Sequence, residues 1–410
     1  MCGAAPLCAA VLGVVLVVAI AGLAPSFTLA APRSGDDPPA KDDGGPTTRK
    51  SKGRPSGGES ADKKTKKKDG GGGKVDMSDV PADEKAEKKA LEALGDLAEH
   101  FKIKRTMHFS VLYDTTDEDV GAFGAAVEKT YRSCAKFSDK LGIRVKPLKR
   151  KLLIHYFNDL GDYSAHSEKC GYGKKPETVP GFYAPNVNRS YFYNFRNSAT
   201  FKKLRQDAEA RIKQLGEQVR RGGLSAEERK RLSAEIKQAR AVLTRMNGLG
   251  GDMSEQTIQH EVAHQVLWNI GFHNAKQFQA NPRWLAEGMA QLFEPVSTGK
   301  AANIGLVNQT RLRAFQRLVQ AGKLVPLREF VATSGYFNYP EVAYPESWAL
   351  VHYITRVKGD ELKAFVRLVN KRPKDYQPTP EDEVATFERA FGKIDDQWVA
   401  NWLKWMEKVR

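Results

Sequence analysis

Cysteine and histidine are scarce in this chain of 410 residues, which contains four cysteines and eight histidines. Cys2 and Cys8 lie in the first ten residues, so only Cys134 and Cys170 belong to the rest of the chain. This count excludes a small disulfide-rich scaffold, and it leaves open whether these two form one disulfide or stay as free thiols. The hydrophobic content of 41% is enough for one large or two ordinary domains with a buried core.

The N-terminus has the apolar run that an export signal requires. The run extends from about Ala9 to Ala24, and small residues follow it, with Thr28 and Ala30 spaced as for a cleavage site. This pattern predicts a signal peptide over residues 1–30. No Lys or Arg precedes the run, so an uncleaved membrane anchor is the alternative. In either case the bulk of the protein is predicted to be extracytoplasmic, secreted or periplasmic.

Acidic residues are outnumbered, because 65 Lys and Arg stand against 49 Asp and Glu, for a formal net charge of +16. A basic surface favours an anionic partner such as nucleic acid, a cell-wall polymer or acidic lipid. The sequence shows no recognised nucleic-acid-binding motif, so we expect no specific nucleic-acid binding. An anionic cell-envelope polymer is the candidate partner of this surface, and an ordinary solvated surface is the alternative.

The composition changes twice before the first regular elements. Residues 31–80 are rich in Pro, Gly, Ser, Asp and Lys and hold almost nothing apolar, which predicts a disordered linker. The pattern from Asp83 onward predicts a helix over 83–101, a strand over 107–114, a helix over 120–141 and a strand over 151–157. A short helix and then a hairpin of strands GFYAP and SYFYNF are predicted to follow. Helices and strands in this order indicate an α+β domain over residues 83–300.

Residues 199–247 repeat apolar side chains at intervals of three and four in two runs, which predicts two antiparallel helices. Gly222 and Gly223 separate the runs, and Ser225 and Glu228 have the spacing of a capping box that restarts the second helix. We therefore expect an inserted helical hairpin. Its many basic residues either contact an anionic partner or form a solvated face.

The stretch HEVAH contains two candidate metal ligands. His260 and His264 lie four apart in a segment predicted to be helical up to Gly271, so both imidazoles project from one face and can share one ion. Glu261 is expected to lie beside the metal and not to bind it. From this position a carboxylate can deprotonate a metal-activated water. So short a motif also occurs by chance, and a third ligand therefore decides its meaning.

The third ligand of such a site is either a histidine or a carboxylate. The metzincin spacing requires glycine and histidine where this chain has Leu267 and Ile270, and His273 falls outside that register. Glu287 is the carboxylate that remains.

Glu287 lies in the stretch NPRWLAEGMAQLFE. This stretch predicts a helix that is capped by Asn281, begins near Pro282 and ends before Pro295. The apolar residues of this helix can pack while Glu287 faces the helix of the two histidines. A glutamate on the surface is the alternative.

HEVAHQ and WLAEGMAQLFE, with 22 residues between His264 and Glu287, resemble the arrangement of gluzincin zinc metallopeptidases. They are similar to the M1 aminopeptidase pattern, in which HExxH is followed by a spacer of eighteen residues and then by WLNEG. The similarity is closer to secreted bacterial peptidase-MA-like domains of unknown function. The order of elements over residues 105–294 matches these domains, and the four extra residues of the spacer fall in the loop 272–281.

The resemblance implies a thermolysin-like catalytic domain with an N-terminal mixed sheet, an HExxH helix and one Zn²⁺. His260, His264 and Glu287 are then the zinc ligands, and Glu261 is the general base.

The resemblance also implies a transition-state donor, usually a tyrosine ahead of a helix downstream of the third ligand. AYPESWALVHYI fits this place, because Pro345 can open a helix and leave Tyr344 at its start, where a phenol can donate to an oxyanion. Tyr336, Tyr339 and His352 are rival donors. A tyrosine that only packs the start of the helix is the remaining alternative.

These features predict an exported zinc metallopeptidase that hydrolyses peptide bonds, with a helical C-terminal part over residues 301–410 closing the cleft. A peptide or protein is the expected substrate, and either GFYAP or SYFYNF is the edge strand that pairs with it. The glycine-rich strand by which M1 aminopeptidases hold an amino terminus is not found, so aminopeptidase specificity is not predicted. The alternative function is a non-catalytic gluzincin-like protein that binds an anionic cell-surface polymer or a protein, and the intact Glu261 argues against it.

Overall fold

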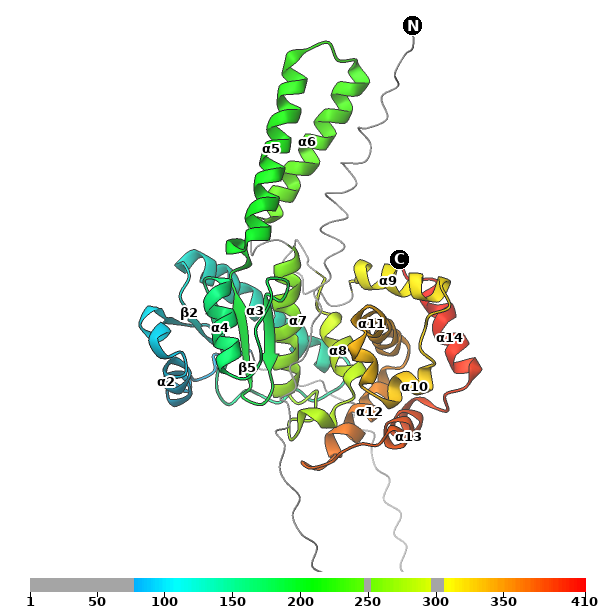
Figure 1. Cartoon of the computed structure of the whole chain (residues 1–410). Coiled ribbons are helices and arrows are strands. Elements are labelled where there is room, and N and C mark those ends of the chain that lie inside the picture. Colours follow the sequence, from blue (N-terminus) through cyan, green and yellow to red (C-terminus); the bar gives the residue numbers. More distant parts are fainter. Residues whose placement is uncertain (1–76, 247–251, 296–305) are drawn as a thin grey trace, which may run out of the picture.

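The computed structural model describes residues 77–246, 252–295 and 306–410 (Figure 1). The predicted signal peptide and residues 31–76 of the predicted linker lie outside these residues. The last residues assigned to the linker pack on the domain: Val80 is buried and donates its N–H to the carbonyl of Met107, and the carboxylate of Asp79 lies 2.6 Å from Lys151 Nζ. The packed part of the chain therefore begins before Asp83.

A mixed five-stranded sheet forms the centre of the N-terminal half. Its strands are β1 (Lys102–Arg105), β2 (Phe109–Tyr113), β3 (Leu152–Phe157), β4 (Gly181–Ala184) and β5 (Arg189–Tyr193). The order is β1-β2-β3-β5-β4, with β2, β3 and β5 parallel in the middle and antiparallel strands at both edges. The predicted α+β class is confirmed. GFYAP supplies the edge strand β4, whereas SYFYNF supplies the inner strand β5.

Helices cover both faces of this sheet, which is why the central strands are buried along almost their whole length. The helices are α2 (Glu84–Glu92), α3 (Asp117–Lys140), α4 (Leu160–Lys169) and α7 (Asp252–Asn269). Val111 and Ile154 face the side of α3 and α7, while Leu112 and Leu153 face the side of α2 and α4, as expected from the period of two.

The single helix predicted over residues 83–101 is wrong, and β1 was not predicted. Helix α2 ends at Glu92, and a 3₁₀ helix follows over Gly95–His100, because Gly95 adopts a positive φ of 65°. Strand β1 contains one apolar residue among four, so it shows no alternation that a pattern could detect.

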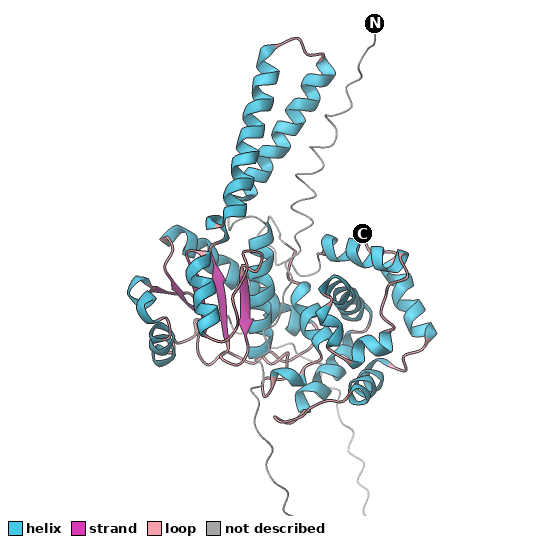
Figure 2. Ribbon diagram, in the orientation of Figure 1, coloured by secondary structure: helices cyan, strands magenta, loops and turns pink. Residues whose placement is uncertain are grey.

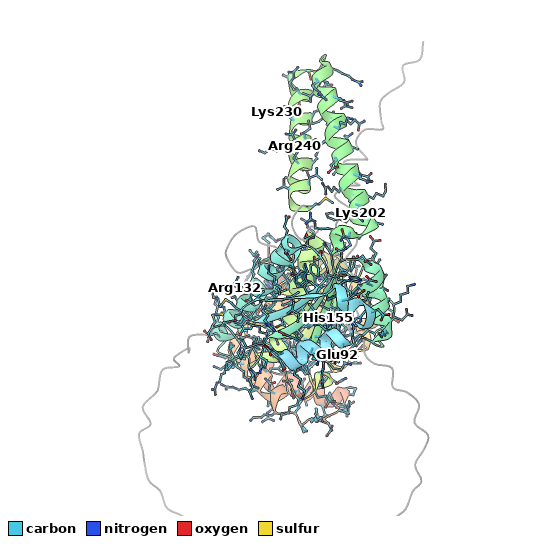
Figure 3. All side chains as sticks on the ribbon, turned by 90° about the vertical axis from the view of Figure 1, so that its left-hand side faces the viewer. Glu92, Arg132, His155, Lys202, Lys230 and Arg240 are labelled. Atoms are coloured by element: carbon cyan, nitrogen blue, oxygen red, sulfur yellow. The ribbon has the colours of Figure 1, made fainter. Side chains whose placement is uncertain are left out.

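Residues 199–246 form an antiparallel helical hairpin, here called the arm, made of α5 (Ala199–Arg221) and α6 (Ala226–Met246). Between the helices, Gly222 and Gly223 adopt positive φ angles of 80° and 74°. Ser225 Oγ accepts from Glu228 N, and Glu228 Oε2 accepts from Ser225 N, so the capping box forms. The arm projects from the body in Figures 1 and 3.

The C-terminal half is helical and lies on the far side of α7 from the strands (Figure 2). Its helices are α8 (Arg283–Gln291), α9 (Gln309–Gln320), α10 (Leu327–Ala332), α11 (Pro340–Val357), α12 (Gly359–Lys371), α13 (Pro380–Phe391) and α14 (Asp396–Met406). Helix α11 contacts α8, α9, α12 and α14. The crossing with α8 is close, since a Cβ atom on Gly288 would come within 2.5 Å of the carbonyl oxygen of Ser347. Within the residues that the structure describes, no helix is long and apolar enough to span a membrane.

Candidate metal centre

The two histidines lie on a helix that is buried on every side. Helix α7 packs against α3, against strands β4 and β5, and against α8, and every residue from Gln259 to Leu267 is buried. His260 and His264 are 0% and 2% exposed. Polar side chains at such depth require partners, because burial without compensation costs free energy.

The structure brings the three predicted ligands together. His260 Nε2 lies 3.1 Å from His264 Nε2, and Glu287 Oε2 from α8 lies 3.3 Å and 3.5 Å from these two nitrogens. Ligand atoms placed about 2.1 Å from a tetrahedral zinc ion are about 3.4 Å apart, so the triangle has the size that such an ion requires. These three side chains therefore form a candidate metal centre.

Glu287 and His264 have polar atoms that no other described residue satisfies. Within the described residues, the two carboxylate oxygens of Glu287 and the Nδ1 of His264 have no hydrogen-bond partner. The Glu287 side chain is 1% exposed. Burial alone would raise the pKa of Glu287, but the imidazoles of His260 and His264 hold it well below its usual range. A cation inside the triangle would complete the coordination of an ionised, buried carboxylate.

A second glutamate supports the first histidine from the side opposite the triangle. His260 Nδ1 lies 2.9 Å from Glu294 Oε1, and the same carboxylate accepts from Arg311 Nε and Nη2, at 3.1 and 2.9 Å, and from Asn308 Nδ2 at 2.6 Å. Burial would raise the pKa of Glu294, but Arg311 and His260 lower it to about 2. An ionised Glu294 accepts the Nδ1 proton of His260, so the lone pair of Nε2 faces the triangle.

No role was predicted for Glu294 or Arg311. Glu294 follows Glu287 by seven residues, which would be two helical turns, but α8 ends at Gln291 and helical spacing therefore does not apply. Arg311 comes from α9, and nothing in the local sequence links it to the histidines.

Glu261 is held by the edge of the sheet. Its side chain is 4% exposed, and Oε2 accepts a hydrogen bond of 2.8 Å from the backbone N–H of Tyr183 in β4. Burial raises the pKa of Glu261, although His260 and His264 oppose this shift. A raised pKa brings a carboxylate closer to the range in which a general base works at neutral pH.

Tyr344 lies inside a helix rather than before one. The prediction that Pro345 opens the helix is wrong, because α11 begins at Pro340, whose missing N–H suits the first turn, and Pro345 lies one turn inside it. Tyr344 is nevertheless 2% exposed, and burial together with the charges of Glu287 and Glu261 raises its pKa well above 10. Its ring lies beside Arg311, whose guanidinium carbon is 5.3 Å from the ring centre and which also binds Glu294.

The rival donors have other partners or face solvent. The hydroxyl of Tyr336 donates to Glu329, and Tyr339 is 61% exposed. His352 stacks on Trp348, with 4.9 Å between the ring centres.

Asn281 does not cap α8, so that prediction is wrong. Helix α8 begins at Arg283 with no side-chain cap, and Asn281 Oδ1 instead accepts from Asn274 N at 2.7 Å. The amide of Asn274 donates to the carbonyls of Val369 and Arg372, at 2.9 and 3.1 Å. The long loop between the histidines and Glu287 is thus fixed to the end of α12.

The comparisons with known proteins leave the activity open. Residues 254–375 match DUF1570, a family of proteins of unknown function, and this segment contains all of the residues of the candidate centre and Tyr344. No curated protein and no solved structure matches the chain.

Proposed function

We propose that this protein is a zinc-dependent peptidase of the gluzincin type, exported by the signal expected over residues 1–30. The observation that carries the proposal is the closed triangle of two imidazole nitrogens and one carboxylate oxygen on buried helices, with Glu261 next to it. Two histidines and one glutamate are a ligand set of catalytic zinc sites, which keep the fourth position for water or substrate.

The residues around the triangle suit peptide hydrolysis. A bound zinc ion would polarise the substrate carbonyl and lower the pKa of a water molecule. Glu261 takes a proton from the attacking water and passes it to the leaving amine, and the N–H of Tyr183 holds this carboxylate in place. Tyr344 is the group that donates to the developing oxyanion.

The fold supports a substrate that is bound as a strand. Tyr183 directs its N–H toward Glu261 and away from β5, so the outer edge of β4 runs along the candidate centre. An extended peptide can add to such an edge by main-chain hydrogen bonds, which would place its carbonyl beside Glu261. An antiparallel edge strand beside the HExxH helix, followed by a second helix with the third ligand, also supports a thermolysin-like arrangement.

Metal analysis and a peptide screen test this proposal. The purified protein should hold close to one zinc ion, and Glu287→Ala should lose most of it. The zinc-loaded protein should cleave members of a mixed peptide library, and a chelator should stop this cleavage.

Two variants separate catalysis from metal binding. Glu261→Gln should keep its zinc and lose several orders of magnitude in cleavage, since general-base assistance is worth about a hundredfold or more. Tyr344→Phe should lose on the order of a hundredfold, mainly in turnover. Glu217→Gln, the same chemical change on the arm, is the matched control. Cleavage by Glu261→Gln at the parental rate would refute the proposal and favour the non-catalytic binding protein.

A further inference from the structure

A cavity of about 700 Å³ is lined by residues of the same elements that carry the candidate metal centre. Trp268 lines it from α7, one turn after His264, and Arg283 lines it from α8, one turn before Glu287. Pro185, directly after β4, lines it from the edge of the sheet. All three elements that carry the centre therefore continue into the wall of the cavity, and Ala286 in this wall directly precedes the ligand Glu287.

The wall combines apolar and polar residues and has an excess of positive charge. Its apolar residues include Trp268, Phe278, Val331 and Pro378. Its charged residues are Lys276, Arg283 and Glu383, and the carboxylate of Glu383 is neutralised by two hydrogen bonds from Arg372, at 2.8 and 2.9 Å. Within the part of the chain that the structure describes, neither Lys276 nor Arg283 has an acidic group within hydrogen-bonding distance. The cavity therefore favours an anion.

Arg283 is fixed in position but has unused donors. Its guanidinium lies over the ring of Phe337, with its carbon 4.6 Å from the ring centre. Nε and Nη2 are buried, and among the described residues neither has a hydrogen-bond partner. The nearest carboxylate, Glu287 Oε1, is 3.7 Å from Nε and belongs to the triangle, where a cation would share its charge. Buried donors without acceptors are unfavourable, so a ligand that supplies an acceptor gains affinity if the guanidinium turns toward the cavity to meet it.

We propose that Arg283 recognises a carboxylate of the substrate in this cavity, so that the protein prefers acidic peptides. This inference rests on the proposed peptidase function and names its substrate class. A planar guanidinium can hold a carboxylate by two parallel hydrogen bonds, and the apolar wall can take the methylenes beside it. The carboxylate comes either from an Asp or Glu side chain or from the free C-terminus of the peptide.

Matched peptides test the recognition and separate its two sources. One pair differs by Glu against Gln next to the cleaved bond, and the other by a free acid against an amide at the C-terminus. The parent protein should cleave the acidic member of at least one pair with a kcat/KM about 10- to 100-fold higher, mainly through KM. Arg283→Gln should lose this preference, and Arg283→Lys should keep only part of it. Arg132→Gln removes the same charge from the surface of the body (Figure 3) and should keep the preference.

A binding measurement makes the result independent of catalysis. Titration calorimetry of the same peptides on zinc-loaded Glu261→Gln should show tighter binding of the acidic member, and adding Arg283→Gln or Arg283→Lys should weaken it. Acid-selective binding that depends on Arg283, without cleavage by the parent, would overturn the peptidase proposal and support this inference. Cleavage or binding with no preference in either pair would overturn this inference and leave the peptidase proposal standing.

Discussion

Replacing Glu294 with glutamine should weaken zinc binding about 10- to 100-fold, although Glu294 is not one of the three ligands. Its carboxylate accepts from His260 Nδ1 at 2.9 Å and so directs the lone pair of Nε2 toward the ion. Glutamine keeps the shape of the side chain but removes the charge that makes this imidazole a stronger donor to the metal. The effect on zinc affinity corresponds to about 1.4 to 2.7 kcal/mol.

The same change should destabilise the fold, because Arg311 loses its counterion. The side chain of Arg311 is 7% exposed, and it forms a buried ion pair with Glu294 through two hydrogen bonds. Removing one partner of such a pair costs about 3 to 5 kcal/mol. Glu294→Gln combined with Arg311→Met removes both charges, so it should recover most of the stability but not the zinc affinity.

Two measurements separate these effects. Chelator competition gives the zinc dissociation constant, and urea unfolding of the metal-free protein gives the free energy of unfolding. Glu209→Gln breaks an exposed ion pair with Arg205 on the arm and should change neither quantity by more than about 1 kcal/mol. If Glu294→Gln binds zinc as tightly as the parent protein, the support of His260 by this carboxylate plays no part in metal binding.

Three further predictions concern stability. Burial raises the pKa of Glu346 to about 7, so the folded state keeps the proton of this carboxyl at a higher pH than the unfolded state does. The free energy of unfolding should therefore fall by about 1 to 3 kcal/mol as the pH rises from about 4.5 to 7. In urea unfolding, Glu346→Gln should lack this part of the pH dependence. Gly288→Ala should lower stability by about 1 to 3 kcal/mol in the same assay, since the added methyl group meets Ser347, and a neutral effect would show that α8 and α11 can separate. A chain that begins at residue 83 should melt several degrees below one that begins at residue 77, because it lacks the buried Val80, and equal melting temperatures would show that this segment does not stabilise the body.

What the sequence could predict of the site was the part encoded by local spacing. A spacing of four residues in a helix places His260 and His264 on one face. The pattern around Glu287 predicted which carboxylate would be the third ligand. The support of His260 by Glu294 and Arg311 could not be predicted, because it depends on how α9 packs against the end of α8. Such a contact leaves no periodic signal in the sequence.

For the fold, elements with a strong apolar alternation or helical period were predicted to within a few residues. Two of the errors lie where a single polar or cyclic residue was interpreted by its usual local role. Asn281 bonds across a loop instead of capping a helix, and Pro345 is tolerated inside α11 because Pro340 has already begun it. In both cases tertiary contacts outweigh the local preference.

The outer part of the arm and the body of the protein should unfold as two separate cooperative units. Its buried side chains Ala208, Leu215 and Leu232 belong to neither of the two hydrophobic clusters of the body, whereas Phe201 and Met246 at its base join one of them. Lys230 and Arg240 lie out along the arm, beyond Lys202 near its base (Figure 3). Local opening of the outer turns therefore exposes only a small core, so their amide protons exchange at a lower free energy than those of α7. The outer arm can unfold and refold while α7, the buried helix with the two histidines, stays folded.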